Sequence, residues 1–158
     1  YSVNVPLFPY TGDETYLWAF RQVVSPLVEA FRPDVLVGQL GIDSYQTDPL
    51  THLMLTSSGY VEAVTELANL GLPWVALGGG GYDRGAVARC WSLAYGVMIG
   101  AEWPDQIPQS YKESYGVEVL RDSVVPQVDE PLQAQMWQFA RETIREVQEL
   151  VFPAHNLG

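Results

Sequence analysis

Two stretches of the sequence carry side chains that could do chemistry. Asp43 follows the apolar run 35–40, and Tyr82 ends a glycine run that follows the apolar run 74–77. A carboxylate just past a buried strand is well placed to bind a metal ion or to orient a catalytic group. A phenol on a loop can donate a hydrogen bond to a developing oxyanion. The alternatives are a turn-capping aspartate and a tyrosine that only packs, and position alone leaves both open.

The glycine run, residues 78–81, contains four consecutive glycines. Each has a conformational cost of roughly 0.5–1 kcal/mol relative to alanine. One glycine suffices for a tight turn from a strand into a helix, so four indicate a pocket wall that something approaches closely. A phosphate-binding loop is a weaker interpretation, because the run lacks the Gly-Lys-Ser/Thr ending.

The sequence lacks other groups that a complete catalytic site would need. Its two histidines, His52 and His155, lie far apart and do not have metal-ligand spacing. There is no Ser-His-Asp order, Cys-His pair or Cys-x-x-Cys motif, and the single cysteine, Cys90, excludes a disulfide within the chain. Alone, the chain offers neither a three-ligand zinc site nor an obvious general base.

Alternating strands and helices must position these residues. The runs 35–40 and 74–77 are continuously apolar, which is typical of parallel strands covered on both faces. Apolar residues at spacings of three and four predict amphipathic helices between and after them. The first helix is expected to start at Thr11-Gly12-Asp13, the second to be capped by Ser57 or Ser58, and the third to be opened by Asp83. The alternation predicts an α/β fold with a three-layer α/β/α arrangement and a mainly parallel sheet.

The flanking segments are less regular. Residues 3–7 are interpreted as the end of a strand, and Pro26 should kink the first helix or end it early. Residues 101–131 contain four prolines and are expected to wrap irregularly over the surface. Residues 132–152 carry the pattern of a final amphipathic helix.

Composition narrows the class of protein further. The chain has 158 residues, 47% of them apolar, and a net charge of −11. A globular domain fits these values, whereas direct nucleic-acid binding does not fit the negative charge. No apolar run approaches the roughly 18 residues of a membrane span. The opening residues lack an initiator Met and a signal-peptide pattern, so we expect a cytoplasmic location and a piece cut from a longer chain.

Three groups of motifs, in this order and spacing, together resemble one family. The first group is Asn4-Val5-Pro6-Leu7 with Thr11-Gly12-Asp13, the second is Gln39-Leu40-Gly41-Ile42-Asp43-Ser44 with Asp48-Pro49-Leu50 and Leu55-Thr56, and the third is Gly78-Gly79-Gly80-Gly81-Tyr82 with Ala88-Arg89-Cys90-Trp91. These motifs resemble those of the histone deacetylases and acetoin-utilisation proteins, zinc-dependent enzymes of the arginase/deacetylase fold. The resemblance covers residues 1–100 well and the remainder loosely. It implies that residues 1–158 are the carboxyl-terminal portion of a single deacetylase domain.

The resemblance implies a role for individual residues. Asp43 would be one of three protein ligands to zinc, and Tyr82 would donate a hydrogen bond to the substrate carbonyl and the tetrahedral oxyanion. Gly80 and Gly81 would line the narrow channel that admits an acetyl-lysine side chain, and Leu50 would lie on the channel wall.

The resemblance also implies that parts are missing. The family's paired histidines, the Asp-x-His that supplies two further zinc ligands, and most of its monovalent-cation (K⁺) sites lie upstream of this segment. Ile42 is bulkier than the small residue common at that position in the family. The stretches 9–11, 16–20 and 49–53 resemble the bacterial acetoin-utilisation deacetylases most.

These observations support one leading function and two alternatives. The leading interpretation is a fragment of a zinc-dependent amidohydrolase that removes acetyl groups from protein lysines, inactive alone. The alternatives are a non-catalytic truncated paralogue or interaction module, and a deacetylase of small molecules such as acetylated polyamines. Cutting a parallel sheet exposes a strand edge and apolar faces, so we expect the fragment to self-associate, as a homodimer.

Overall fold

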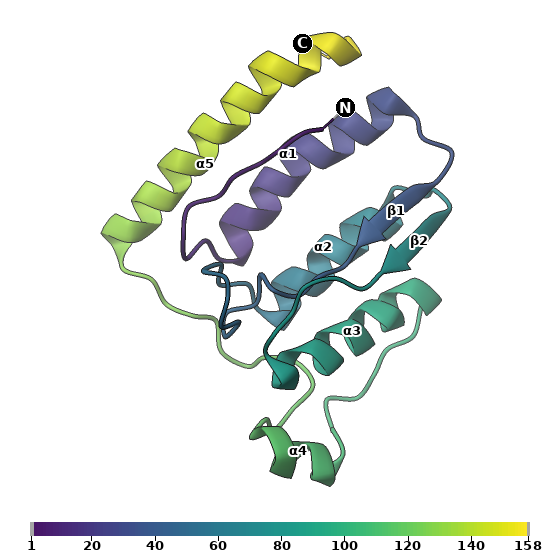
Figure 1. Ribbon diagram of the computed structural model, residues 1–158, viewed down its shortest axis with the longest axis vertical. Coiled ribbons are helices and arrows are strands. Elements are labelled where there is room, and N and C mark those ends of the chain that lie inside the picture. Colours follow the sequence, from purple (N-terminus) through teal and green to yellow (C-terminus); the bar gives the residue numbers. More distant parts are fainter. Residues whose placement is uncertain (1, 158) are drawn as a thin grey trace.

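The computed structural model describes residues 2–157 of the chain, which form helices and a small parallel sheet (Figure 1). The confirmed elements are two strands with a helix after each, and a long first and last helix. The elements are α1 (Asp13–Phe31), β1 (Leu36–Gln39), α2 (Ser57–Asn69), β2 (Trp74–Leu77), α3 (Arg84–Ile99), α4 (Gln109–Tyr115), α5 (Glu130–Val151) and the 3₁₀-helix η1 (Phe152–His155). None of the helices in residues 2–157 combines the length and the apolar character that crossing a membrane requires.

The sheet pairs β1 with β2 in parallel, with Val37 opposite Val75 and Gln39 opposite Leu77. Side chains of successive strand residues point to opposite faces. On one face, Leu36, Gly38 and their partners on β2 are at least half-buried, whereas the other face carries Val37, Val75 and Leu77, all of them exposed. The α/β class is confirmed, but the strands are not covered on both faces as expected: in the described residues, helices cover one of the two sheet faces.

The main hydrophobic core lies between the covered face of the sheet and helices α2 and α3. Both helices have clear ends: the Thr56 hydroxyl caps α2 by accepting from the backbone N–H groups of Ser58 and Gly59, and the Asp83 carboxylate caps α3. Burial raises the pKa of the Cys90 thiol in this core to about 12, so this cysteine is an unreactive packing residue. The buried core residues are Leu40, Ile42, Tyr45, Tyr60, Val64, Ala86, Cys90 and Ala94.

Helix α1 packs between α2 and α5, and its proline does not end it. Pro26 lies inside α1, which continues to Phe31, contrary to an early end. A proline removes the hydrogen bond to the carbonyl four residues earlier, here that of Gln22. The side-chain amide of Gln148 on α5 donates to this carbonyl at 3.4 Å. The side chain of Gln148 on α5 therefore replaces the N–H donor that α1 lacks at Pro26.

Two local expectations were wrong, and a third was incomplete. Residues 3–7 form no strand; instead Val5 and Leu7 pack against the cluster shared by α1 and α5. The cap of α2 is Thr56 and not Ser57 or Ser58. Residues 101–131 are mostly irregular as expected, but they include the short helix α4.

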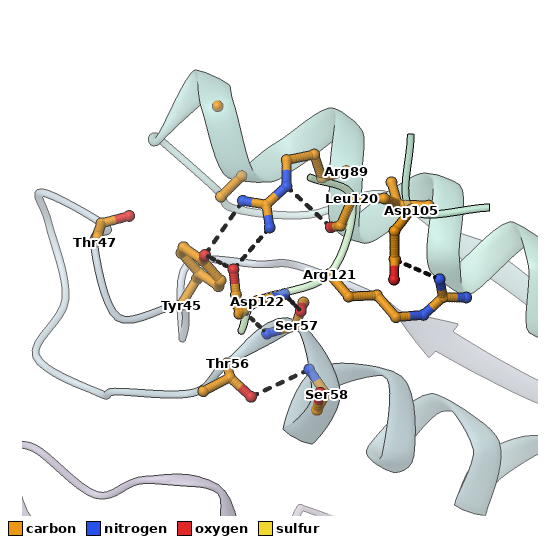
Figure 2. A network of polar contacts seen from close by, with 12 residues as sticks. Tyr45, Thr47, Thr56, Ser57, Ser58, Arg89, Asp105, Leu120, Arg121 and Asp122 are labelled. Carbon is orange, nitrogen blue, oxygen red and sulfur yellow. Dashed lines mark hydrogen bonds and ion pairs between the residues drawn. The ribbon is translucent and has the colours of Figure 1, made fainter. Parts of the chain in front are cut away.

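A buried ion pair ties the loop before α2 to α3 and to the segment after α4 (Figure 2). The Arg89 guanidinium on α3 contacts the Asp122 carboxylate at 2.7 Å, and both side chains are largely buried. Arg89 also donates to the carbonyl of Leu120 and to the Tyr45 hydroxyl. Asp122 accepts from the backbone N–H of Ser57 at 2.7 Å, and its own N–H donates to the Ser57 hydroxyl. Every charge in this network is therefore hydrogen-bonded, as burial requires.

The same contacts set the pKa of Asp122. Burial alone would raise it, but hydrogen bonds from the Ser57 backbone, Arg89 and Tyr45 outweigh burial and hold the pKa below its usual value. A carboxyl group with a lowered folded-state pKa stabilises the fold above its unfolded pKa of about 4. That contribution is lost as pH falls through the lower, folded-state value.

We predict that Asp122→Ala destabilises the protein by roughly 3–5 kcal/mol at neutral pH, because it leaves the Arg89 charge buried without a partner. The difference from wild type should shrink as pH falls below about 4. Urea unfolding across a pH series measures both effects. The matched control is Asp105→Ala, which breaks the exposed ion pair with Arg121 and should change stability by less than about 1 kcal/mol. Equal effects of the two substitutions would contradict the importance of burial.

Candidate active site

The loops that follow β1 and β2 run side by side beyond the ends of the strands. Backbone hydrogen bonds continue past the sheet, from Leu40 N–H to the Leu77 carbonyl at 2.8 Å and from Ile42 N–H to the Gly80 carbonyl at 2.7 Å. Asp43 is the next residue, so its position is set by the strand pairing. The parallel sheet thus places the two predicted loops at one edge.

Helices α2 and α3 fix the point where β1 turns into its loop. The Tyr60 hydroxyl on α2 and the Trp91 indole N–H on α3 both donate to the carbonyl of Leu40, at 3.0 and 2.8 Å. One carbonyl with two such donors cannot rotate freely. The chain therefore enters the Asp43 loop from a rigid base.

The glycine run is needed because the Asp43 loop lies directly against it. A Cβ on Gly80 would overlap the Asp43 carboxylate, and a Cβ on Gly79 would lie 2.8 Å from the backbone of Gly41. Gly81 has a φ of +145°, and a Cβ there would lie 2.6 Å from the Ile42 side chain. Three of the four glycines thus serve the contact between the loops, a role that the interpretation as a pocket wall did not include.

Asp48 joins the two loops through hydrogen bonds. Its carboxylate is buried; Oδ1 accepts from the backbone N–H of Leu50 at 2.9 Å, and Oδ2 accepts from the backbone N–H of Tyr82 at 2.8 Å. Two hydroxyl groups make further hydrogen bonds. Thr51 donates to the backbone carbonyl of Asp43, and Thr47 donates to the carboxylate of Asp83, which caps α3. Together these bonds hold the loop that carries Asp43 to the loop that carries Tyr82.

The five residues predicted from the sequence all lie on these two joined loops. Asp43 is half-buried against Gly80, and Gly81 touches Ile42. The side chains of Tyr82 and Leu50 are exposed, at 53% and 64%. The structure therefore places the predicted set on two joined loops at the sheet edge, with the Tyr82 side chain exposed.

Helix α1 contributes a residue that the sequence did not single out. Burial, and then the negative charge of Asp43, raise the pKa of Tyr16 above its usual value. Tyr16 therefore lies within electrostatic range of Asp43, although its spacing marked it only as part of an apolar helix face. Asp48 belongs to the second group of motifs, but the sequence predicted no role for it.

The metal-binding capacity of the described residues is limited. Within residues 2–157, no three or more His, Cys, Asp or Glu side chains form a group that could hold a metal ion. A catalytic zinc needs three protein ligands. Asp43 fits as one of them, because Gly80 leaves room for its carboxylate.

A separate groove of about 760 Å³ lies between α3 and residues 103–120. Aromatic side chains line it, including those of Trp91, Tyr95 and Trp103. Neither Asp43 nor Tyr82 is among its lining residues, so the groove is distinct from the candidate site.

Comparison with known proteins decides the family. A model of the histone deacetylase domain matches residues 1–98, which include both loops. This chain belongs to the histone deacetylase family. It is 38% identical to the putative histone deacetylase 2 of Caenorhabditis elegans, over 82% of this chain and 26% of that protein. It is 39% identical to histone deacetylase 19 of Arabidopsis thaliana, over 73% of this chain and 23% of that protein.

The fold agrees with the family. A crystal structure of an HDAC homolog complexed with SAHA superimposes with a TM-score of 0.77 and 25% identity, over 92% of this chain and 41% of that one. The predicted arginase/deacetylase fold is thereby confirmed. The chain spans about a quarter of the length of the curated relatives it matches.

We predict that Gly79→Ala destabilises this histone deacetylase segment by roughly 1–3 kcal/mol, because the new methyl group would push the Gly41 backbone away. Chemical denaturation of the purified protein measures the loss. Gly38→Ala on β1 is the control, because a methyl there makes ordinary contacts of 3.5–3.8 Å; it should be neutral or slightly stabilising. A neutral Gly79→Ala would show that the loops do not need their close approach.

Proposed function

We propose that these residues form the carboxyl-terminal portion of a zinc-dependent amidohydrolase that removes acetyl groups from protein lysines. The observation that carries the proposal is the joining of the Asp43 loop to the Tyr82 loop, at the edge of the sheet where the family motifs lie. A ligand of acetyl-lysine type is supported by the HDAC homolog, which was solved in complex with SAHA. A likeness to bacterial acetoin-utilisation deacetylases and a cytoplasmic location stay predictions.

In this proposal, each residue of the two loops has one task. Asp43 supplies one zinc ligand, and the remaining ligands come from other parts of the natural protein. Zinc, when bound, would polarise the amide carbonyl and activate a water molecule. The exposed phenol of Tyr82 would donate a hydrogen bond to the carbonyl oxygen and stabilise the oxyanion that develops from it. Gly80 and Gly81, which have no side chains, and Leu50 would border the substrate channel.

The 158 residues by themselves should be inactive. The described part of the chain holds no three-ligand metal group, and the sequence holds no paired histidines. We therefore expect no turnover of an acetyl-lysine peptide by the isolated chain with added zinc. Turnover by the isolated chain would overturn the proposed division of the site. K⁺ sites are likewise expected outside these residues.

We predict that Tyr82→Phe lowers kcat about 10²–10³-fold in the full natural protein that contains these residues, because it removes an oxyanion donor. The assay is steady-state hydrolysis of an acetyl-lysine peptide with zinc present. Tyr95→Phe is the control: Tyr95 is 54% exposed against 53% for Tyr82, but it lies on α3 in the separate groove.

Asp43→Asn should lower zinc occupancy, measured by metal analysis after dialysis.

The outcomes separate the candidate functions. Activity on acetylated polyamines but not on peptides would favour a small-molecule deacetylase. A full protein that binds no zinc and hydrolyses neither substrate would favour a non-catalytic interaction module. An unchanged kcat for Tyr82→Phe would contradict the role proposed for the phenol.

We also propose that the isolated 158-residue chain forms a homodimer through the uncovered sheet face. The exposed Val37, Val75 and Leu77 on this face support the proposal, because a contiguous apolar surface favours association. Sedimentation velocity over a concentration series should show a dimer, and Val37→Lys should shift it to monomer. A monomer at every concentration, or a dimer that Val37→Lys leaves intact, would contradict this interface.

A further inference from the structure

The Asp48 side chain divides its two carboxylate oxygens between two loops. Oδ1 accepts from the backbone N–H groups of its own loop, at Leu50 (2.9 Å) and Thr51 (3.3 Å). Oδ2 accepts from the backbone N–H of Tyr82 at 2.8 Å, 34 residues away in sequence. The side chain is 8% exposed. A buried carboxylate is destabilising unless it is well hydrogen-bonded. The Asp48 carboxylate can therefore be buried here because it accepts these three hydrogen bonds.

The bond to Tyr82 fixes a residue that has few other constraints. Glycines precede Tyr82 in the chain, and its own ring is half exposed. Bonds from backbone N–H groups to a charged carboxylate are among the stronger hydrogen bonds in proteins. The Asp48 bond therefore sets where the Tyr82 side chain leaves the backbone, immediately before the cap of α3.

Asp48 also reaches the other candidate residue. The backbone N–H of Thr51 donates to the Asp48 carboxylate, and the Thr51 hydroxyl donates to the backbone carbonyl of Asp43. A continuous path of hydrogen bonds thus runs from Tyr82 through Asp48 and Thr51 to Asp43. One buried carboxylate sits between the proposed oxyanion donor and the proposed zinc ligand.

We propose that Asp48 is a positioning residue for the reaction: it holds the Tyr82 phenol at a fixed place relative to Asp43. The inference rests on the proposed function, since it requires that Tyr82 acts in the reaction. It goes beyond that proposal by assigning the site's geometry to a side chain whose carboxylate accepts only from backbone N–H groups of the two loops. Misplacement of a reacting group by about 1 Å can lower a rate about 10²-fold.

The substitution Asp48→Asn separates this role from a general structural one. An asparagine keeps one oxygen, which can still accept from Leu50 and Thr51 in its own loop. Its amide group then replaces Oδ2 and cannot accept from the Tyr82 N–H. The variant should therefore keep its own loop and lose only the bond between the loops.

The experiment measures kcat and KM for an acetyl-lysine peptide with the zinc-loaded full natural protein. Asp48→Asn should lower kcat about 10–100-fold, the range seen for residues that orient a site from outside it, with KM changed less than about 3-fold. In a Tyr82→Phe background, Asp48→Asn should lower kcat less than about 3-fold further, because the residue it positions is gone. Asp129→Asn, at the cap of α5, is the control and should leave kcat unchanged.

Three results would overturn the inference. Asp48→Asn could leave kcat intact, it could lower kcat equally with and without Tyr82, or it could act only by unfolding the protein. Thermal unfolding and hydrogen exchange of the Tyr82 amide address the last case: exchange should quicken at residues 80–83 while Tm falls by no more than a few degrees. Inactive wild-type protein would instead refute the proposed function, and the exchange measurement would still show whether Asp48 holds Tyr82.

Discussion

The parallel pairing of β1 with β2 is the constraint on which the candidate site depends. Parallel strands end at the same edge of a sheet, so the loops after them must start side by side. Here the hydrogen bonding continues beyond the strands, as far as Ile42 and Gly80. Asp43 and Tyr82, which lie 39 positions apart by the difference of their numbers, are thereby carried on adjacent loops. Helices α2 and α3 pack against the covered face of this pair and hold the Leu40 carbonyl where β1 ends.

Close approach of the loops explains a sequence feature that is otherwise unfavourable. Glycines lose more backbone entropy on folding than other residues. At positions 79, 80 and 81, any side chain would meet the Asp43 loop, and Gly81 also adopts a positive φ. The entropy loss is offset by contacts that need no side chains, such as the Ile42 to Gly80 hydrogen bond. The same geometry leaves space for the Asp43 carboxylate, so packing and the proposed metal ligation favour the same residue type.

The sequence predicted what depends on local pattern and missed what depends on tertiary contacts. The apolar run 74–77 located β2, and Asp83 located the start of α3. Both signals lie within a few neighbouring residues of the sequence. The persistence of α1 through Pro26 was missed, because the compensating donor comes from Gln148 on a distant helix. The role of Asp48 was missed for the same reason: its key partner lies 34 residues away. Tyr16 had the spacing of a core residue, and only its proximity to Asp43 marks it otherwise.

Contacts within the chain place both loops of the candidate site. Asp43 is placed by strand pairing, by the Thr51 hydroxyl and by the absence of a side chain on Gly80. The backbone of Tyr82 is placed by Asp48. All of these groups belong to residues 39–83, so the contacts that order this share of the site lie within one segment. Preorganisation of this kind lowers the free-energy cost of assembling a site, because the ordering is completed when the protein folds. In the proposed function, this segment supplies the geometry of the two loops, and the strand pairing, the glycines and the Asp48 carboxylate are what provide it.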